Sequence, residues 1–531
     1  MQESQLVEMD DHFSREEGSF APLIERIDAI DHTRRAIFED GKWASFGDLH
    51  ELSMRVQGAL AARGVARGSR ILSIVSNGTG FIALLLACMR MGAVLAPLDL
   101  GLSSREVALF IETANPSLIV IGDERYANVA EESEATLARI SDLLVEPASS
   151  ESHAAPSPNP DDPCLIVFTS GSTGSPKGVL LPVRSICHAA SSLAKGLGLV
   201  DSDIVLNALP VCHLFSINAG TLAPLISGAP IVTMPHFQPN VALDLIEGQR
   251  ASVFNGVPTM YRRLAKEQQE HPRDIGSLRG GYIAGAKCGT VAAYHDILGF
   301  TPSTLYGLTE FPVIALEPLN SAFTCDEGKV GSVIDGVSLC FEMDRDDADG
   351  TQLGEILCKG PQSMLGYFGN AKKTSEVIDD LGWVHTGDLG YLDKDNRLHV
   401  SGRKDDVINK GGNKVFPAEV EAVCLEHSDI VECCVLGMPH DELGEQIVVF
   451  AQVGEQSNLQ CEDLRKFAQA SLSRYKLPDQ LVLVQQMPYL HNGKTDKAML
   501  RRLYGMPDDK GRLHEISRNG EPAVSLAAAI A

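Results

Sequence analysis

Short apolar runs alternate with longer amphipathic segments in the N-terminal part of the chain. Residues 70–76, 93–98 and 118–122 are apolar, rich in β-branched side chains and bounded by polar residues, which predicts buried strands. The apolar stretch 80–91 between the first two has the length of a helix. Alternation of strand, helix and strand predicts a parallel, doubly wound sheet.

The same alternation returns further along the chain and then changes its texture. After about residue 350 the apolar runs are short and separated by Gly and Asp, which predicts a β-rich region. From residue 405 onward a small unit of strands and helices follows, with a helix expected at 461–475. A stretch rich in Pro, Ser and Ala, residues 146–163, predicts a linker or exposed loop. The remaining strands are expected at 204–209, 230–234, 251–257, 281–285, 430–436 and 446–453, and a strand leading into a helix at 415–425.

Length and charge narrow the class of protein. A chain of 531 residues is too long for one core, so two or more domains are expected. Hydrophobic residues make up 44% and charged residues 22%, as in ordinary globular proteins. The formal net charge of −25 argues against nucleic acid as a partner, because phosphate neutralisation needs clustered Lys and Arg.

Targeting and cysteine patterns favour a cytoplasmic protein. The acidic N-terminus lacks the apolar region of a signal peptide. The longest candidate for a membrane span, residues 81–89, has about half the length that a bilayer requires. Twelve cysteines without a C-x-x-C pair indicate reduced thiols rather than a disulfide framework or a zinc site.

A loop rich in glycine and hydroxyl side chains follows the apolar strand expected at 165–168. Glycines let backbone N–H groups approach a ligand, hydroxyls add donors and a lysine adds positive charge, which together suit a phosphate chain. The spacing differs from the common P-loop, because Pro176 lies where that motif needs its second glycine. The alternative is a flexible Ser/Gly surface loop. The candidate phosphate-binding residues are Thr169, Ser170, Gly171, Ser172, Thr173, Gly174 and Lys177.

This loop resembles the signature loop of the adenylate-forming superfamily, which includes acyl- and aryl-CoA synthetases, luciferases and the adenylation domains of peptide synthetases. Four further segments resemble that family in the same order. They are Thr-Leu-Tyr-Gly-Leu-Thr-Glu at 304–310, Thr-Gly-Asp at 386–388, the long segment 401–421 and Gly-Lys at 493–494. The resemblance covers roughly residues 30–503 and is closest to acyl- and aryl-CoA ligases.

The resemblance implies an ATP site built from several motifs. Tyr306 offers a flat face to adenine, and Thr309 donates to a phosphate. Glu310 ligates Mg²⁺, a cation that prefers oxygen. Asp388 accepts the ribose hydroxyls, although an ordinary turn Asp is the alternative. The other residues that the resemblance assigns to ATP or AMP are Gly285, Ala286, Thr304, Gly307 and Arg403.

The acyl pocket is expected around His213, Phe215 and Gly256. A histidine satisfied within the core is an equal alternative for His213. Amino-acid-activating relatives supply an Asp in this region, and the absence of one favours a carboxylic acid without an α-amino group. Lys287 is unusual beside adenine, and either pairs with an anionic part of the substrate or reaches solvent.

The last motifs imply a small mobile domain. The expected fold is α/β: a large N-terminal domain, residues 1–402, with doubly wound sheets and a β-rich subdomain, and a small α+β domain, residues 403–531. Asp405 is the expected hinge and Lys494 the expected catalytic lysine. Gly411, Gly412 and Lys414 would line the acceptor channel. Lys414 and Asn409 depart from many CoA ligases, which leaves the acceptor open.

The implied reaction is ATP-dependent activation of an organic carboxylic acid as acyl-AMP, with Mg²⁺, followed by transfer to a thiol. Coenzyme A is the expected acceptor, and an amine or a carrier protein is the alternative. A non-enzymatic nucleotide-binding protein is a third class, disfavoured because Thr309, Glu310, Asp388, Arg403 and Lys494 are all present. A homodimer is left open.

Overall fold

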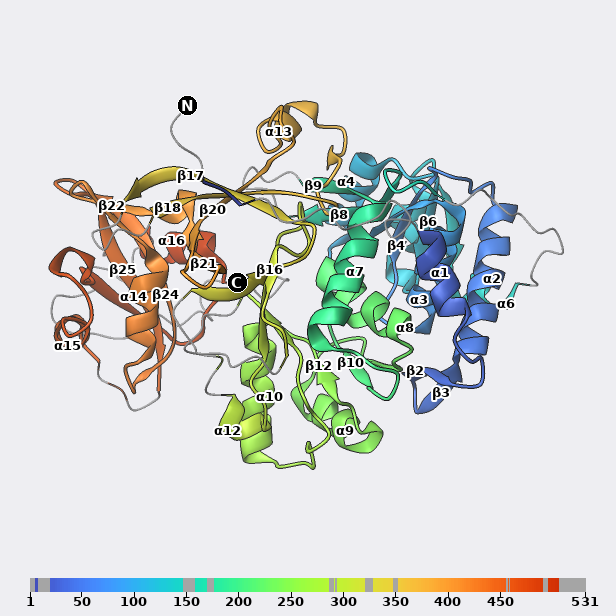
Figure 1. The fold of residues 1–531 in the computed structure, drawn as a ribbon, viewed down its shortest axis with the longest axis horizontal. Coiled ribbons are helices and arrows are strands. Elements are labelled where there is room, and N and C mark those ends of the chain that lie inside the picture. The colour runs from blue at the N-terminus through green and yellow to red at the C-terminus, as the bar shows by residue number, and fades with distance from the viewer. Residues whose placement is uncertain are drawn as a thin grey trace.

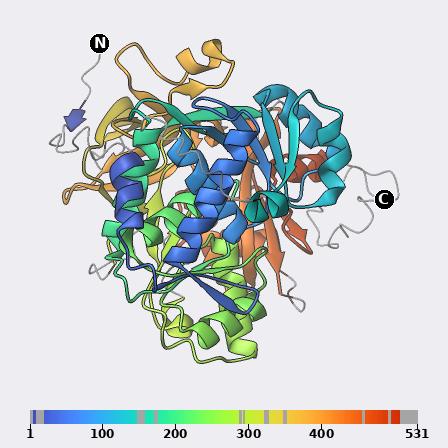
Figure 2. The ribbon, with the colours of Figure 1, turned by 90° about the vertical axis from the view of Figure 1, so that its right-hand side faces the viewer.

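The computed structural model shows two α/β layers and a mixed sheet that lead into a small C-terminal unit (Figures 1 and 2). It describes residues 5–7, 20–146, 158–169, 176–285, 291, 294–319, 328–346, 352–454, 457, 459–489 and 495–505.

A seven-stranded sheet carries the first part of the chain, with the order β19-β9-β8-β5-β4-β6-β7. The strands from β8 to β7 run parallel, whereas β9 and β19 are antiparallel to their neighbours. Its members are β4 (Arg70–Ile74), β5 (Val94–Pro97), β6 (Leu118–Ile121), β7 (Thr136–Arg139), β8 (Pro163–Thr169), β9 (Lys177–Pro182) and β19 (Gly366–Tyr367).

Helices cover both faces of this sheet, because side chains alternate between its faces. On β6, Leu118 and Val120 join one core with α3 (Thr79–Met91). Ile119 and Ile121 join another core with α4 (Ser104–Ala114). The predicted doubly wound α/β sheet is therefore confirmed.

A five-stranded sheet has the order β12-β10-β11-β2-β3 and is parallel apart from β3. Leu206 of β10 packs in a core with α9 (Pro239–Gln249) and α10 (Pro258–Glu270). Val205 joins a core with α7 (Val183–Leu197) on the opposite face. The strands are β2 (Arg35–Glu39), β3 (Lys42–Ser45), β10 (Val205–Asn207), β11 (Ile231–Thr233) and β12 (Val253–Phe254).

A nine-stranded mixed sheet has the order β1-β17-β18-β20-β21-β16-β15-β14-β13 and includes the β-rich region expected after about residue 350, although β1 and β13 to β17 come earlier in the chain. Its long antiparallel strands bring distant motifs to one surface. They are β1 (Gln5–Val7), β13 (Tyr282–Ala284), β14 (Ser303–Tyr306), β15 (Ala315–Leu316), β16 (Lys329–Val333), β17 (Ser338–Asp346), β18 (Gln352–Lys359), β20 (Val384–Leu392) and β21 (Arg397–Arg403).

The C-terminal sheet is separate and has helices on both faces. Val449 of β25 packs with α14 and α15, and Phe450 packs with α16 on the other side. The predicted helix 461–475 is wrong in length, because α15 ends at Ala468. Residues Arg474–Lys476 form only a single 3-10 turn. Leu477 is then extended, because the residue before a proline avoids the helical region. The elements are β22 (Ile408–Lys410), β23 (Asn413–Val415), α14 (Pro417–Leu425), β24 (Ile430–His440), β25 (Gly444–Val453), α15 (Cys461–Ala468), β26 (Gln480–Val484) and α16 (Lys497–Gly505).

Local capping explains several helix starts. Ser45 and Asp48 form a capping box at α2, and Ser103 and Glu106 form another at α4, so each pair satisfies backbone N–H groups reciprocally. The remaining helices are α1 (Phe20–Asp28), α2 (Phe46–Ala62), α5 (Ala127–Glu131), α6 (Ile140–Val145), α8 (Ala223–Ser227), α12 (His295–Leu298) and α13 (Ala371–Ser375). The 3-10 and π turns are η1 (Glu124–Tyr126), η2 (Ser216–Leu222), η3 (Lys404–Asp406) and η4 (Arg474–Lys476).

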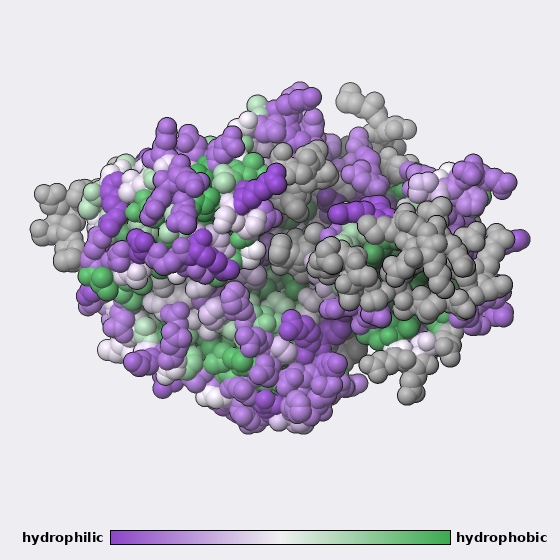
Figure 3. Space-filling view, turned by 180° about the vertical axis from the view of Figure 1, so that it is seen from behind, coloured by the Kyte–Doolittle hydropathy of each residue, from purple (hydrophilic) through white to green (hydrophobic). Residues whose placement is uncertain are grey.

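The cysteines and the surface fit the composition. The ten cysteines within the described ranges form no disulfide with one another. Hydrophilic residues cover much of the face in Figure 3, in keeping with the charged composition. No helix in the described part of the chain is both long enough and apolar enough to cross a membrane.

Candidate active site

The two ends of the predicted phosphate loop are neighbours on a hairpin. Thr169 at the end of β8 pairs with Lys177 at the start of β9. The Lys177 Nζ lies 6.0 Å from the centre of the Tyr367 ring, which favours the cation. Ser170, Gly171, Ser172, Thr173 and Gly174 lie outside the described residues.

Tyr367 joins this hairpin to Glu310, the predicted metal ligand. Its hydroxyl donates to Glu310 Oε1 at 2.7 Å, and β19, which carries it, pairs with β9. Burial, and then the Glu310 carboxylate, raise the pKa of Tyr367, so the hydroxyl stays a donor. Glu310 is half-buried, and its carboxylate oxygens are of the hard kind that Mg²⁺ prefers as ligands. Sequence reasoning missed Tyr367, whose only signal was its place in an apolar run.

Asp388 is the point at which three motifs meet. It lies on β20 and is 8% exposed. The Tyr306 hydroxyl from β14 donates to Asp388 Oδ2 at 2.7 Å, and Arg403 Nη1 from β21 donates to Oδ1 at 3.1 Å. Arg403 also donates to the Thr386 carbonyl at 3.0 Å. The sheet therefore brings together side chains from residues 306, 388 and 403.

The electrostatics of this group keep Asp388 able to bind further donors. Each carboxylate oxygen has two lone-pair directions, so one donor on each leaves room for a pair of hydroxyls. Burial, and then the Asp388 charge, raise the pKa of Tyr306, which keeps its proton. Burial acts to lower the pKa of Arg403, but the Asp388 carboxylate outweighs it and raises that pKa.

Two neighbouring residues of the Tyr306 motif serve the chain itself. A Cβ on Gly307 would lie 2.0 Å from the Pro312 carbonyl oxygen, so only glycine permits this turn. Thr304 is buried, and its hydroxyl donates to the Val330 carbonyl at 2.7 Å. Thr309 is half-buried in the loop that joins β14 to β15. The ATP contacts predicted for these three residues stay predictions.

The predicted acyl-pocket residues lie around a π-helix. His213 and Phe215 are half-buried and precede η2, all seven residues of which are buried. Phe215 packs against two of the cores. A π-helix is rare and often marks a functional site, and the sequence did not reveal it.

Gly256 continues this region across the strand ends. It pairs with Ile283 of β13, and its N–H donates to the Tyr282 carbonyl at 3.0 Å. Gly285, at the end of β13, has a φ of +72°, which glycine adopts readily. Ala286 and Lys287 lie outside the described residues.

The predicted hinge and acceptor residues lie at the start of the small domain. Asp405 is exposed in η3, between the nine-stranded sheet and the C-terminal sheet. Gly411 and Gly412 form the two-residue turn between β22 and β23, with φ of +56° and +84°. Lys414 is half-buried on β23. The hinge, the domain boundary and the acceptor channel stay predictions.

Lys494 lies outside the described residues, but both flanks of its segment are described. Tyr489 and Thr495 form an isolated antiparallel bridge. The N–H of Asp496 donates to the Pro488 carbonyl at 2.8 Å. These contacts join Pro488 and Tyr489 to Thr495 and Asp496.

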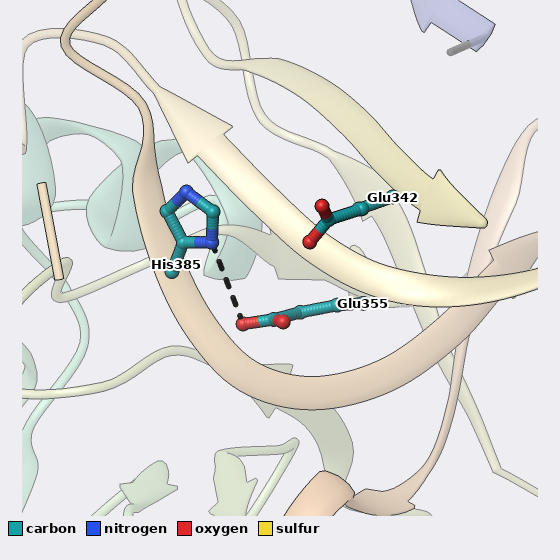
Figure 4. Close-up of side chains that lie close together, drawn as sticks. All are labelled: Glu342, Glu355 and His385. Atoms are coloured by element: carbon teal, nitrogen blue, oxygen red, sulfur yellow. Dashed lines mark ion pairs between the residues drawn. The ribbon is translucent and has the colours of Figure 1, made fainter. Parts of the chain in front are cut away.

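Glu342, Glu355 and His385 lie together on β17, β18 and β20 (Figure 4). His385 Nδ1 is 3.8 Å from Glu355 Oε1. The other Glu355 oxygen already accepts Lys404 Nζ at 2.7 Å, and the Gly387 N–H donates to Oε1 at 3.1 Å. Glu355 thus supports the Thr-Gly-Asp turn and the residue before the hinge.

Comparison with known proteins agrees with this geometry. The AMP-binding enzyme family matches residues 26–368, and the AMP-binding enzyme C-terminal domain matches residues 419–494. A feruloyl-CoA synthase from Amycolatopsis sp is 28% identical over 473 residues, covering 88% of this chain and 96% of that protein. The fatty acid–[acyl-carrier-protein] ligase ScoC from Streptomyces coeruleorubidus is 29% identical, covering 89% and 94%.

A solved structure is similar along nearly the whole chain. The ATP-bound crystal structure of MatB from Rhodopseudomonas palustris has a TM-score of 0.82 and 27% identity, covering 91% of this chain and 98% of that one. The apo structure of the same protein has a TM-score of 0.75 and 26% identity, with the same coverage.

The family match spans more than half of the chain and includes the Tyr306 motif and the hairpin that carries Thr169 and Lys177. The protein uses ATP to activate a carboxylic acid. The chain therefore belongs to the AMP-binding enzyme family, the adenylate-forming superfamily, as an AMP-forming carboxylate ligase of the acyl- and aryl-CoA ligase type.

Proposed function

We propose that the protein joins an organic acid lacking an α-amino group, of the aromatic type named for its relatives, to coenzyme A through an acyl-AMP intermediate. The meeting of Tyr306 and Arg403 on the buried Asp388 carboxylate carries the proposal. It provides an acceptor for a ribose, a ring face for adenine and a cation for a phosphate. The relatives named for feruloyl-, 4-coumarate- and indoleacetate-CoA formation support an aromatic acid.

In the first half-reaction the carboxylate oxygen of the acid attacks the α-phosphorus of ATP. An O–P bond forms, the bond to the β-phosphate oxygen breaks, and pyrophosphate leaves. The difficulty is electrostatic, because an anion approaches a polyanion, and preorganised positive groups lower that barrier. Lys177, Arg403 and Lys494 are the proposed cations of the chain. Mg²⁺ held by Glu310 would neutralise phosphate charge in the same step.

In the second half-reaction a thiol sulfur attacks the acyl carbon. A C–S bond forms, the bond from that carbon to the AMP oxygen breaks, AMP leaves and the thiol proton passes to solvent. Gly411 and Gly412, whose turn has no side chains, are the proposed lining for the arm of the acceptor. The small domain would reorient about Asp405 between the two steps.

A carrier-protein thiol is the second candidate acceptor, and the similarity to ScoC favours it. Asn409 and Lys414 lie beside the proposed channel, where many CoA ligases have other residues. Lys414, on β23, is the cation proposed to lie near the acceptor.

The test is acid-dependent release of pyrophosphate and AMP from ATP across a panel of ferulate, 4-coumarate, indole-3-acetate, aliphatic acids and amino acids. Release with an acid but not with amino acids is the expected result. The active acid is then supplied with CoA, with a phosphopantetheinylated carrier protein, or with free amines. A thioester of CoA is expected, and formation of an amide alone would overturn the thiol assignment.

A further inference from the structure

A buried carboxylate of the small domain is shared by both domains. Glu432 on β24 is 8% exposed. Arg262 Nη1, from α10 of the large domain, lies 2.5 Å from Glu432 Oε2. The Tyr489 hydroxyl, from the small domain, donates to the same oxygen. A buried charge requires such partners, because its removal from water is otherwise unfavourable.

We propose that this interdomain triad, Arg262, Glu432 and Tyr489, holds the small domain in its adenylation orientation and thereby positions Lys494. The inference rests on the proposed role of Lys494 in acyl-AMP formation. None of the three residues is assigned to substrate, so they are positioning residues.

Tyr489 links Glu432 to the part of the chain next to Lys494. Tyr489 bridges to Thr495, the residue that follows Lys494 in the chain. Glu432 holds the Tyr489 hydroxyl, and Arg262 holds Glu432. A continuous set of contacts therefore runs from α10 to Thr495, next to Lys494 in the chain.

The charges of Arg262 and Glu432 favour one orientation of the small domain. Burial acts to lower the pKa of Arg262, but the Glu432 carboxylate raises it, so the guanidinium remains charged. Burial, and then the hydrogen bond to Glu432, raise the pKa of Tyr489, which keeps its proton. When the small domain rotates away, Glu432 loses Arg262 but keeps Tyr489. The ion pair therefore stabilises one orientation alone, as a domain switch requires.

The comparison with MatB agrees with this assignment. The TM-score of this chain is 0.82 against the ATP-bound structure of that protein and 0.75 against its apo structure. The chain is more similar to the ATP-bound structure, the state that precedes acyl-AMP formation.

The experiment measures both half-reactions in Arg262→Gln and Glu432→Gln. Acid-dependent ATP–pyrophosphate exchange reports adenylation, and transfer from supplied acyl-AMP to CoA reports the second step. Adenylation kcat should fall about 5- to 150-fold, the usual range of coupling between sites. KM for ATP and transfer should change little. The matched control is Arg250→Gln, which removes an exposed ion pair with Asp274 (2.8 Å) within the large domain and should alter neither step.

The double variant separates positioning from general damage. Because both residues act through one contact, Arg262→Gln combined with Glu432→Gln should lose no more adenylation than the worse single variant. Additive losses, or equal losses in both half-reactions, would overturn the proposal. Hydrogen–deuterium exchange tests the contact even if no acid is activated: faster exchange in α10 and β24 together is expected, and an unchanged rate overturns the triad. Failure of the wild type to form AMP would instead refute the proposed function.

Discussion

Asp388 and Glu432 are two carboxylates with the same chemistry in different mechanical settings. Each is 8% exposed and each accepts one tyrosine hydroxyl and one arginine N–H. The partners of Asp388 come from strands of its own nine-stranded sheet. One partner of Glu432 comes from the opposite domain.

The difference shows how one arrangement can serve two purposes. In the proposed rotation about Asp405 the contacts of Asp388 would persist, because Arg403 ends β21 of the nine-stranded sheet and precedes the hinge, so the Asp388 group suits a ligand that stays bound throughout the reaction. A contact across domains exists in one orientation and biases the equilibrium between two. Variants of the Asp388 group and variants of the interdomain triad should therefore differ in which half-reactions they affect.

The largest effect is expected from Lys494→Ala. Loss of a cation aimed at developing charge costs on the order of 10²- to 10³-fold in rate. Adenylation should fall by that amount, whereas transfer from supplied acyl-AMP should be spared. The two rates are measured separately, with Lys466→Ala, an exposed lysine on α15, as the control. Equal loss of both steps would contradict the division of labour between orientations.

Asp388→Asn should impair both half-reactions. The amide keeps the size of the side chain but leaves Arg403 without its anion, and a hydrogen bond to a charged group is worth about 1.5–3 kcal/mol. The KM for ATP and that for acyl-AMP should both rise, by roughly 10- to 100-fold on that energy. Calorimetric titration of AMP gives the same quantity directly. An effect on one half-reaction only would mean that Asp388, like Glu432, acts in a single orientation of the small domain.

The sequence predicted the Asp388 group because its members lie in recognisable motifs. The residues near 306, 388 and 403 each resembled a known segment, so their roles were assigned before their contacts were known. Apolar runs likewise placed most of the strands predicted from them to within about two residues, since burial on both faces of a parallel sheet requires continuous hydrophobic stretches.

The Glu432 group and Tyr367 could not be predicted in the same way. Arg262 and Glu432 are 170 residues apart, and their meeting depends on how two separate domains pack. Tyr367 contacts Glu310 only because β19 pairs with β9. Each of these side chains alone reads as an ordinary surface or core residue. Tertiary contacts of this kind leave no periodic signal.

Asp405→Pro should hinder rotation of the small domain, whereas loss of the Glu432 contact should destabilise its adenylation orientation. Proline restricts φ and removes an N–H, so a rotation about residue 405 should become less favourable. Transfer should fall about tenfold relative to adenylation, within the usual range of conformational coupling. Glu432→Gln should shift the same ratio the other way. Undiminished transfer in Asp405→Pro, measured from supplied acyl-AMP, would refute the hinge.

The smallest effect is expected from Tyr367→Phe, on β19 of the large domain. The change removes the 2.7 Å hydrogen bond to Glu310 Oε1 and leaves the ring beside Lys177. Because Glu310 is only half-buried, water can take the place of the lost hydroxyl, so the net cost should be about 0.5–1.5 kcal/mol and adenylation should fall roughly 2- to 10-fold. Because Glu310 is the proposed Mg²⁺ ligand, the loss should appear as a higher Mg²⁺ concentration for half-maximal pyrophosphate exchange. Tyr475→Phe, at an exposed tyrosine of the small domain, is the control. If Tyr367→Phe lowered the rate without changing the Mg²⁺ requirement, Tyr367 would orient the β8–β9 hairpin rather than the metal ligand. The Asp388 group would then be the one set of contacts in the large domain to which the comparison with Glu432 applies.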